Sequence, residues 1–133
     1  MRFISIAVFL GLQLIEAGAQ TRPPIQKTPT VPPGKTSDVG FFYAIDPDCS
    51  GRGEIESRII KAPQNGKVEI NPGTNFPTQR DSGPYQACNS VKVPGMIVTY
   101  TPKDGFIGKD EFDLEFIGPR GGDFIWKYYV TVK

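Results

Sequence analysis

Glycine and proline interrupt this chain so often that they limit the structures available to it. The 133 residues include 15 glycines and 13 prolines. From Thr36 onward, no stretch free of both is longer than about eleven residues. Helices of average length rarely fit between such breaks, whereas strands of five or six residues fit well. The spacing therefore predicts an all-β fold built from short strands.

Apolar and polar residues alternate in several of the intervals between these breaks. In Glu111–Phe116, acids alternate with apolar side chains, which is the period-two pattern of a half-buried strand. The same period gives one apolar face to three further strands: Val39, Phe41, Tyr43 and Ile45; Met96, Val98 and Tyr100; and Trp126, Tyr128, Val130 and Val132. Six or seven short strands with frequent turns are typical of a β-sandwich.

Two turns are expected to join neighbouring strands as hairpins. Asn65-Gly66 separates Ile55–Ile60 from Lys67–Ile70, and this dipeptide favours hairpins because both residues tolerate positive φ. The turn Gly118–Gly122 is expected to return the acid-rich strand onto the last one. By contrast, Asn71–Pro84 shows no periodicity and is predicted to be a long loop, which in a compact domain is often functional.

The first residues have the features of a secretory signal peptide. Arg2 supplies a positive charge, Phe3–Ile15 is largely apolar, and Ala17-Gly18-Ala19 fits a small-x-small cleavage site. The apolar run is short for a membrane anchor, which is the alternative interpretation. We therefore expect residues 1–19 to be removed, a secreted or periplasmic protein, and no membrane insertion afterwards.

The stretch Gln20–Lys35 carries five prolines among polar residues. This composition favours an extended, polyproline-like segment over a packed one. We expect residues 20–35 to be flexible and the folded domain to span residues 36–133. The segment is interpreted as a tail without a role, as a spacer, or as a proline-rich ligand.

Cys49 and Cys88 are the two cysteines of the chain. In a protein that leaves the cytosol, an even pair predicts a disulfide. Closing a loop of about 40 residues stabilises a fold by about 4 kcal/mol in the chain-entropy model. A redox-active pair is the alternative, but the chain lacks a CxxC motif and histidine.

Charge and composition exclude several classes of function. Lys and Arg total 15 against 14 Asp and Glu, so the net charge of +1 gives no argument for binding nucleic acid. The absence of histidine removes the commonest general base and metal ligand. We expect no cofactor and no enzymatic activity.

One motif resembles a known group of domains. Val98–Phe112 fits the pattern V-x-Y-x-P-x-x-G-F-x-G-x-D-x-F, and Pro63–Val68 fits P-x-x-G-x-V. Both resemble bacterial Ig-like and cadherin-like domains, over residues 54–133. The resemblance implies an Ig-like β-sandwich of about seven strands in a small secreted bacterial protein of unknown function. Such domains usually form tandem arrays in adhesins, whereas this chain has one copy.

Acidic residues suggest two kinds of site, each with a simpler interpretation. Cadherin-like relatives sometimes bind calcium between repeats, which makes Asp104 and Asp110 calcium candidates, although solvated loop carboxylates explain them as well. Apart from the resemblance, the carboxylate of Asp110 can cap or brace the turn of this motif. Glu111, Asp113 and Glu115 share one strand face, and a carboxylate-only glycoside hydrolase is the enzymatic alternative.

Arginine and aromatic residues are the remaining contact candidates. Both types are common in binding hot spots and can contact sugars or protein side chains. Those expected in or beside loops, or on the outer face of the last strand, are Phe76, Arg80, Tyr85, Arg120 and Tyr129.

We expect a monomeric, non-catalytic binding or interaction module of the cell envelope that recognises an unknown protein or glycan. A structural accessory protein without a specific ligand is the alternative.

Overall fold

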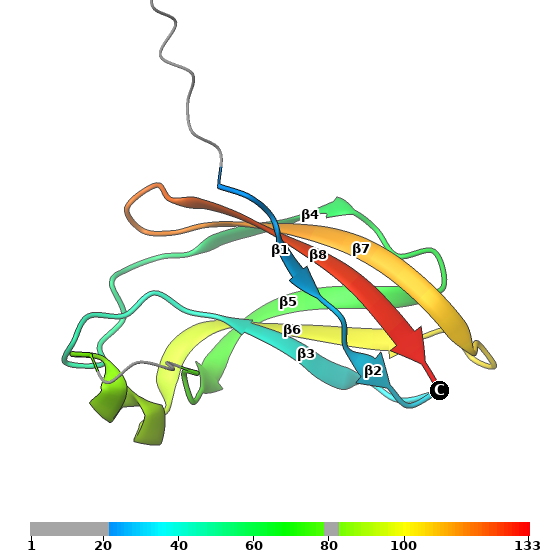
Figure 1. Ribbon diagram of the computed structural model, residues 1–133, viewed down its shortest axis with the longest axis horizontal. Helices are drawn as coiled ribbons and strands as arrows, with labels where there is room; N and C mark the ends of the chain where they lie inside the picture. The colour runs from blue at the N-terminus through cyan, green and yellow to red at the C-terminus, as the bar shows by residue number, and fades with distance from the viewer. Residues whose placement is uncertain (1–21, 79–82) are drawn as a thin grey trace, which may run out of the picture.

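Two β-sheets face each other in the computed structural model, which describes residues 22–78 and 83–133 (Figure 1). The predicted signal peptide, residues 1–19, lies outside this part of the chain. The described strands are β1 (Ile25–Lys27), β2 (Thr30–Val31), β3 (Ser37–Phe42), β4 (Glu56–Lys61), β5 (Gly66–Asn75), β6 (Val93–Pro102), β7 (Gly108–Ile117) and β8 (Asp123–Val132). A short 3₁₀ helix, η1 (Gln86–Ser90), precedes β6. The predicted all-β sandwich is confirmed, with eight described strands instead of about seven.

The first sheet has the order β1-β8-β7-β4, with β2 also paired to β8. The second has the order β3-β6-β5. The hairpin predicted at Gly118–Gly122 is present, since β7 and β8 pair antiparallel over their whole lengths. Among the described residues, none of the helical structure is long and apolar enough to cross a membrane.

The period-two patterns of β6, β7 and β8 place their apolar side chains between the sheets. Phe112, Leu114 and Phe116 are fully buried, as are Tyr100 and Tyr128. The ring of Phe112 stacks between those of the two tyrosines, with ring centroids 5.8 Å and 4.4 Å away. Fully burying one large apolar side chain contributes about 1.5–3 kcal/mol, so these three strands supply much of the folding free energy.

A β-bulge in β3 makes the predicted strand face at Val39–Ile45 wrong. The pairing of β3 with β6 shifts between Asp38 and Gly40. Val39 and Phe42 therefore pack on the main core, while Phe41 and Tyr43 pack on a second cluster formed by Ile45, Cys88 and Val93. A bulge adds one residue to one strand and thereby reverses the alternation beyond it.

The hairpin predicted at Asn65-Gly66 is also wrong. β4 pairs with β7, whereas β5 pairs with β6, so residues 62–65 cross from one sheet to the other. The backbone N–H groups of Gln64 and Asn65 donate to the carboxylate of Asp110 in β7, each at 3.0 Å. A carboxylate between the sheets holds the crossing in place, and a local turn preference cannot reveal that contact.

Part of the segment expected to be flexible, residues 20–35, is folded. β1 and β2 pair parallel with β8, and Val31 is buried in the main core. The prolines flank these short strands or lie between them, where no ladder hydrogen bond is lost. Lys27 lies over the ring of Trp126, 4.1 Å from its centroid, and burial lowers the pKa of this lysine.

The predicted loop Asn71–Pro84 begins later than expected. Strand β5 continues to Asn75, and Pro72 pairs with Met96 in β6. A proline is tolerated here because β5 is an edge strand, which leaves one side of its backbone without a partner. The described part of the loop therefore starts at Phe76.

The predicted disulfide is confirmed. Cys49 and Cys88 are joined with an S–S distance of 2.06 Å and a Cα–Cα distance of 5.4 Å. The bond links the β3–β4 connection to η1, and both cysteines belong to the second apolar cluster.

Candidate binding site

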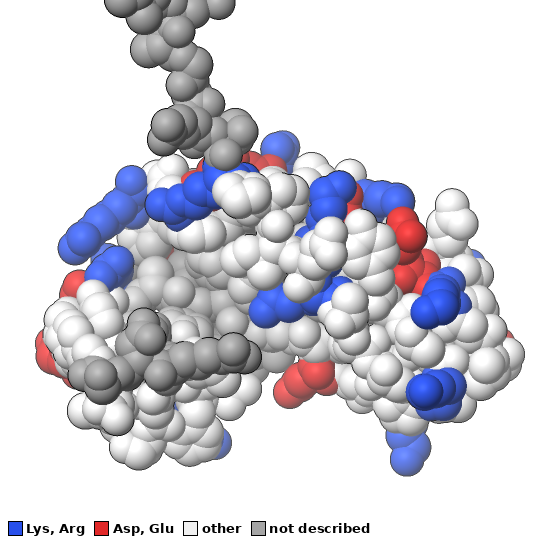
Figure 2. Space-filling view, in the orientation of Figure 1, with Lys and Arg blue, Asp and Glu red and all other residues white. Residues whose placement is uncertain are grey.

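A pocket opens at the end of the sandwich where the β7–β8 turn faces the β3–β4 connection. Its volume is about 460 Å³, within the range of small-molecule sites. Figure 2 shows a hollow in this face of the molecule with basic side chains along its upper edge. We call it the basic pocket, and its lining residues are Arg22, Phe42, Tyr43, Ala44, Ile45, Arg52, Tyr85, Gly118, Pro119, Arg120, Gly122 and Phe124.

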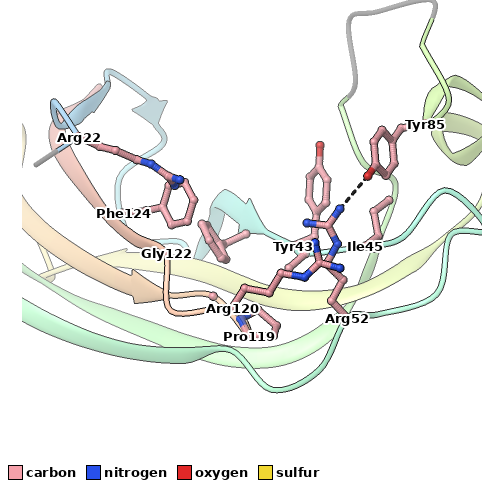
Figure 3. A pocket seen from close by; sticks show the side chains of 12 residues that line it. Arg22, Tyr43, Ile45, Arg52, Tyr85, Pro119, Arg120, Gly122 and Phe124 are labelled. Carbon is pink, nitrogen blue, oxygen red and sulfur yellow. Dashed lines mark hydrogen bonds between the residues drawn. The ribbon is translucent and has the colours of Figure 1, made fainter. Parts of the chain in front are cut away.

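Two arginines converge on one carboxylate at the edge of this pocket. Arg52 Nε lies 3.1 Å from Asp46 Oδ1, and Arg120 Nη2 lies 3.9 Å from the same oxygen. Arg52 also donates from Nη2 to Tyr85 Oη at 2.7 Å (Figure 3). Three separate segments are thus joined by one polar network: the β3–β4 connection, the β7–β8 turn and the residue before η1.

Arg22 lies on the other side of the pocket. Its guanidinium carbon sits 4.3 Å from the centroid of the Phe124 ring, which is a cation–π contact. Figure 3 shows Arg22 along this ring, with Tyr43, Arg52 and Tyr85 across the pocket. Positive charge therefore borders the pocket on both sides.

The charge around this pocket exceeds that of the whole protein. Three guanidinium groups line it, and among the described residues Asp46 is the carboxylate that pairs with two of them. This leaves an excess of two positive charges locally, whereas the complete chain carries +1. Positive and negative residues are nearly equal in number over the chain, but positive charge is concentrated around this pocket.

Local turns, the disulfide and apolar contacts hold these side chains in place around the pocket. The backbone closes a turn at Asp46–Cys49, with Cys49 N–H donating to Asp46 O at 2.8 Å, and the disulfide fixes this turn to η1. Tyr43 and Tyr85 pack against the second apolar cluster. On the facing side, Gly121 has φ +81°, a conformation that favours glycine, in the tight turn that carries Arg120.

The structure brings together two of the five predicted contact residues. Tyr85 and Arg120 both line the basic pocket. Phe76 is exposed and lies beside Lys92, and Tyr129 is exposed on the outer face of β8, so neither lies in the pocket lining. Arg80 lies outside the described residues.

Sequence reasoning missed Arg22, Tyr43 and Arg52 as pocket residues. A usable signal existed for one of them, because Arg52 follows Cys49 by three residues and Tyr85 precedes Cys88 by three. A predicted disulfide brings such neighbours close together. For Arg22 no signal existed, since it precedes a segment that was expected to be flexible.

The two calcium candidates occupy different environments. Asp110 is 5% exposed, and its carboxylate accepts from the N–H groups of Gln64, Asn65 and Glu111 and from the hydroxyl of Tyr100. Asp104 is exposed in the turn after β6. Within residues 22–78 and 83–133, no cluster of three or more His, Cys, Asp or Glu side chains could hold a metal ion. Asp110 therefore braces the crossing at residues 62–65, a contact that its motif did not imply.

The three acids of β7 each face a basic side chain on the outer face of the first sheet. Glu111 pairs with Lys61 at 3.1 Å, Asp113 with Lys127 at 3.7 Å, and Glu115 with Arg58 at 2.5 Å. These ion pairs give the acids a structural role in a cross-strand ladder.

Comparisons with known proteins give little further information. No protein-family model and no curated protein matches the chain. Among solved structures, the chain resembles part of a 2,6-sialyltransferase from Photobacterium sp. JT-ISH-224, crystallised with CMP and lactose. The two are 12% identical with a TM-score of 0.27, and the match covers 84% of this chain and 18% of that one. A likeness of this size carries no inference.

Proposed function

We propose that this protein is a non-catalytic binding module of the cell envelope and that the basic pocket is its ligand site. The observation that carries the proposal is the convergence of three arginines on one pocket of about 460 Å³ with aromatic walls. Arginine and tyrosine are favoured at binding hot spots, and a concave site can desolvate a ligand.

The design of the site supports a role in binding. Its walls come from segments that are far apart in sequence and are fixed by a disulfide and by the Arg52–Tyr85 hydrogen bond. A preorganised site costs less conformational entropy when a ligand binds. A charged pocket whose walls are fixed in this way therefore supports a role in binding a ligand.

The proposed location is secreted or periplasmic. The features of residues 1–19 predict a signal peptide, and a disulfide persists in oxidising compartments. The resemblance of Val98–Phe112 to bacterial Ig-like domains favours a module of the bacterial envelope.

A cross-linking pull-down from envelope extract tests the proposal. The parent protein is compared with Tyr85→Phe/Arg120→Gln, which alters the basic pocket, and with Tyr129→Ala, which removes an exposed ring elsewhere. Arg120 is a suitable target because 75% of its side chain is exposed, so its replacement leaves the core intact. We expect a protein or glycan that the parent and Tyr129→Ala capture and the pocket variant loses. Equal capture by all three proteins, or none by the parent, would contradict the proposal and favour a structural accessory role.

A further inference from the structure

We infer that the basic pocket binds a carboxylate carried on a six-membered ring. This inference rests on the proposed function, because it names the chemical class of ligand for the same pocket. A hexuronic acid residue of a glycan and a simple aromatic acid both present this chemistry.

The charge at one end of the pocket fits a carboxylate. Arg52 and Arg120 both approach Oδ1 of Asp46, so this pair of guanidinium groups is already arranged around one carboxylate oxygen. Two positive charges against one negative charge leave an excess of one. A second, monoanionic carboxylate would neutralise that excess of one, whereas a dianionic phosphate would exceed it at this end, because the third guanidinium, that of Arg22, lies across the pocket.

Donors are available for such a group. A guanidinium has five N–H donors in a planar fork that matches carboxylate geometry. Among the described residues, Arg52 uses Nε for Asp46 and Nη2 for Tyr85. Arg120 approaches Asp46 only at 3.9 Å, and its side chain is 75% exposed, so it can turn toward a ligand.

The walls of the pocket fit a ring. Phe42, Tyr43 and Phe124 are aromatic, and Pro119 adds an apolar surface beside Arg120. Flat apolar surfaces of this kind pack against the C–H face of a sugar or against an aromatic ring. At the far side, Arg22 lies over Phe124, and its N–H groups can donate to hydroxyl or carbonyl oxygens of a ligand.

Isothermal titration calorimetry on the disulfide-bonded protein at low salt tests this inference. The probes are glucuronate, galacturonate and 4-hydroxybenzoate, each compared with its neutral counterpart: glucose, galactose and phenol. Inorganic phosphate is a further probe. We expect at least one of the three acids to bind ten-fold or more tightly than its neutral counterpart and than phosphate. The identity of that acid distinguishes a glycan source from an aromatic one.

Matched charge variants locate the binding. Arg120→Gln is expected to weaken binding of the acid at least five-fold. Lys127→Gln removes one positive charge from the outer face of β8 and is expected to leave the affinity for the acid unchanged. Binding that is equal for acid and neutral probes, tighter for phosphate, or insensitive to Arg120→Gln would overturn the inference, as would no binding of any acid. Pocket-dependent capture in the pull-down would still support the proposed function in each of these cases.

Discussion

Replacing Asp110 with alanine should destabilise the fold more than any other single change to a charged residue of the described chain. Asp110 in β7 accepts four hydrogen bonds, of which the one from Tyr100 Oη is the shortest at 2.7 Å. Two others come from backbone N–H groups of residues 62–65, the crossing between the sheets. The fourth donor, Glu111 N–H, is the next residue in the chain.

The structure sets the size of the effect. Alanine at position 110 leaves the N–H groups of Gln64 and Asn65 without their acceptor, while the hydroxyl of Tyr100 keeps a longer contact to the carbonyl oxygen of Asn65, at 3.5 Å. Each buried donor without a partner costs about 1–3 kcal/mol. Because Asp110 borders a surface pocket of about 260 Å³, water can replace part of the lost interactions. We therefore expect a loss of about 4 kcal/mol, within a typical total stability of about 5–15 kcal/mol.

Thermal and urea unfolding measure this loss. A domain of this size loses about 4 °C in Tm for each kcal/mol, so Asp110→Ala should lower Tm by about 15 °C. Asp110→Asn, which keeps one acceptor oxygen, should lose about half as much free energy. Asp104→Ala is the control, since this acid of the same motif is exposed and its loss should change stability by less than about 0.5 kcal/mol. A loss below about 1 kcal/mol for Asp110→Ala would refute the reasoning.

Three other outcomes follow from the structure. Replacing both Cys49 and Cys88 with serine should lower the free energy of unfolding by about 4 kcal/mol, as measured in urea, because the disulfide closes a long loop; an unchanged midpoint would argue against this. Gly66→Ala should also lower the urea midpoint, since a Cβ would lie 2.6 Å from the Tyr100 ring; a midpoint equal to that of the parent would count against that contact. Burial raises the pKa of Tyr100, which also donates to Asp110, and burial raises that of Tyr128. Above about pH 10 the unfolded chain loses protons that the folded protein keeps, so stability should fall by up to about 1.4 kcal/mol per pH unit for each tyrosine. The fall in stability with pH should be shallower in Tyr128→Phe than in the parent protein, and equal slopes would contradict a raised pKa for Tyr128.

Local sequence patterns were sufficient to predict a strand and its buried face where the period-two alternation continues over the whole strand. The period-two alternation of β7 and β8 and the glycine-rich turn between them place Phe112 and Tyr128 in the core, as predicted. The disulfide followed from the number of cysteines and the predicted export. A bracing role for Asp110 was expected, but the segment that it braces, residues 62–65, was not.

Long-range contacts explain what the sequence did not predict. The bulge at Gly40 lies beside Tyr128 of the facing sheet, where a Cβ would collide with the tyrosine hydroxyl. The crossing at residues 62–65 depends on Asp110, some 45 residues further along the chain. β1 and β2 become ordered by pairing with the last strand. None of these partners is visible in a local window of sequence.

The candidate site was partly predictable for the same reason. Tyr85 and Arg120 could be selected by residue type and by their expected position in loops. Their meeting with Arg52 and Arg22 depends on how four segments come together at one end of the sandwich. Residue type therefore suggested contacts, but the fold was needed to group them into one pocket.

The central claim is that partners bind at the basic pocket, and site-specific photo-cross-linking tests it most directly. A photo-reactive amino acid is placed at position 119 in one variant and at position 129 in another, and both are expressed in the envelope of the source cell. Pro119 lines the pocket and its replacement keeps all three arginines, whereas Tyr129 is exposed on the outer face of β8. We predict a discrete adduct from position 119 and none from position 129. An adduct from position 129 alone, or equal adducts from both positions, would contradict the claim.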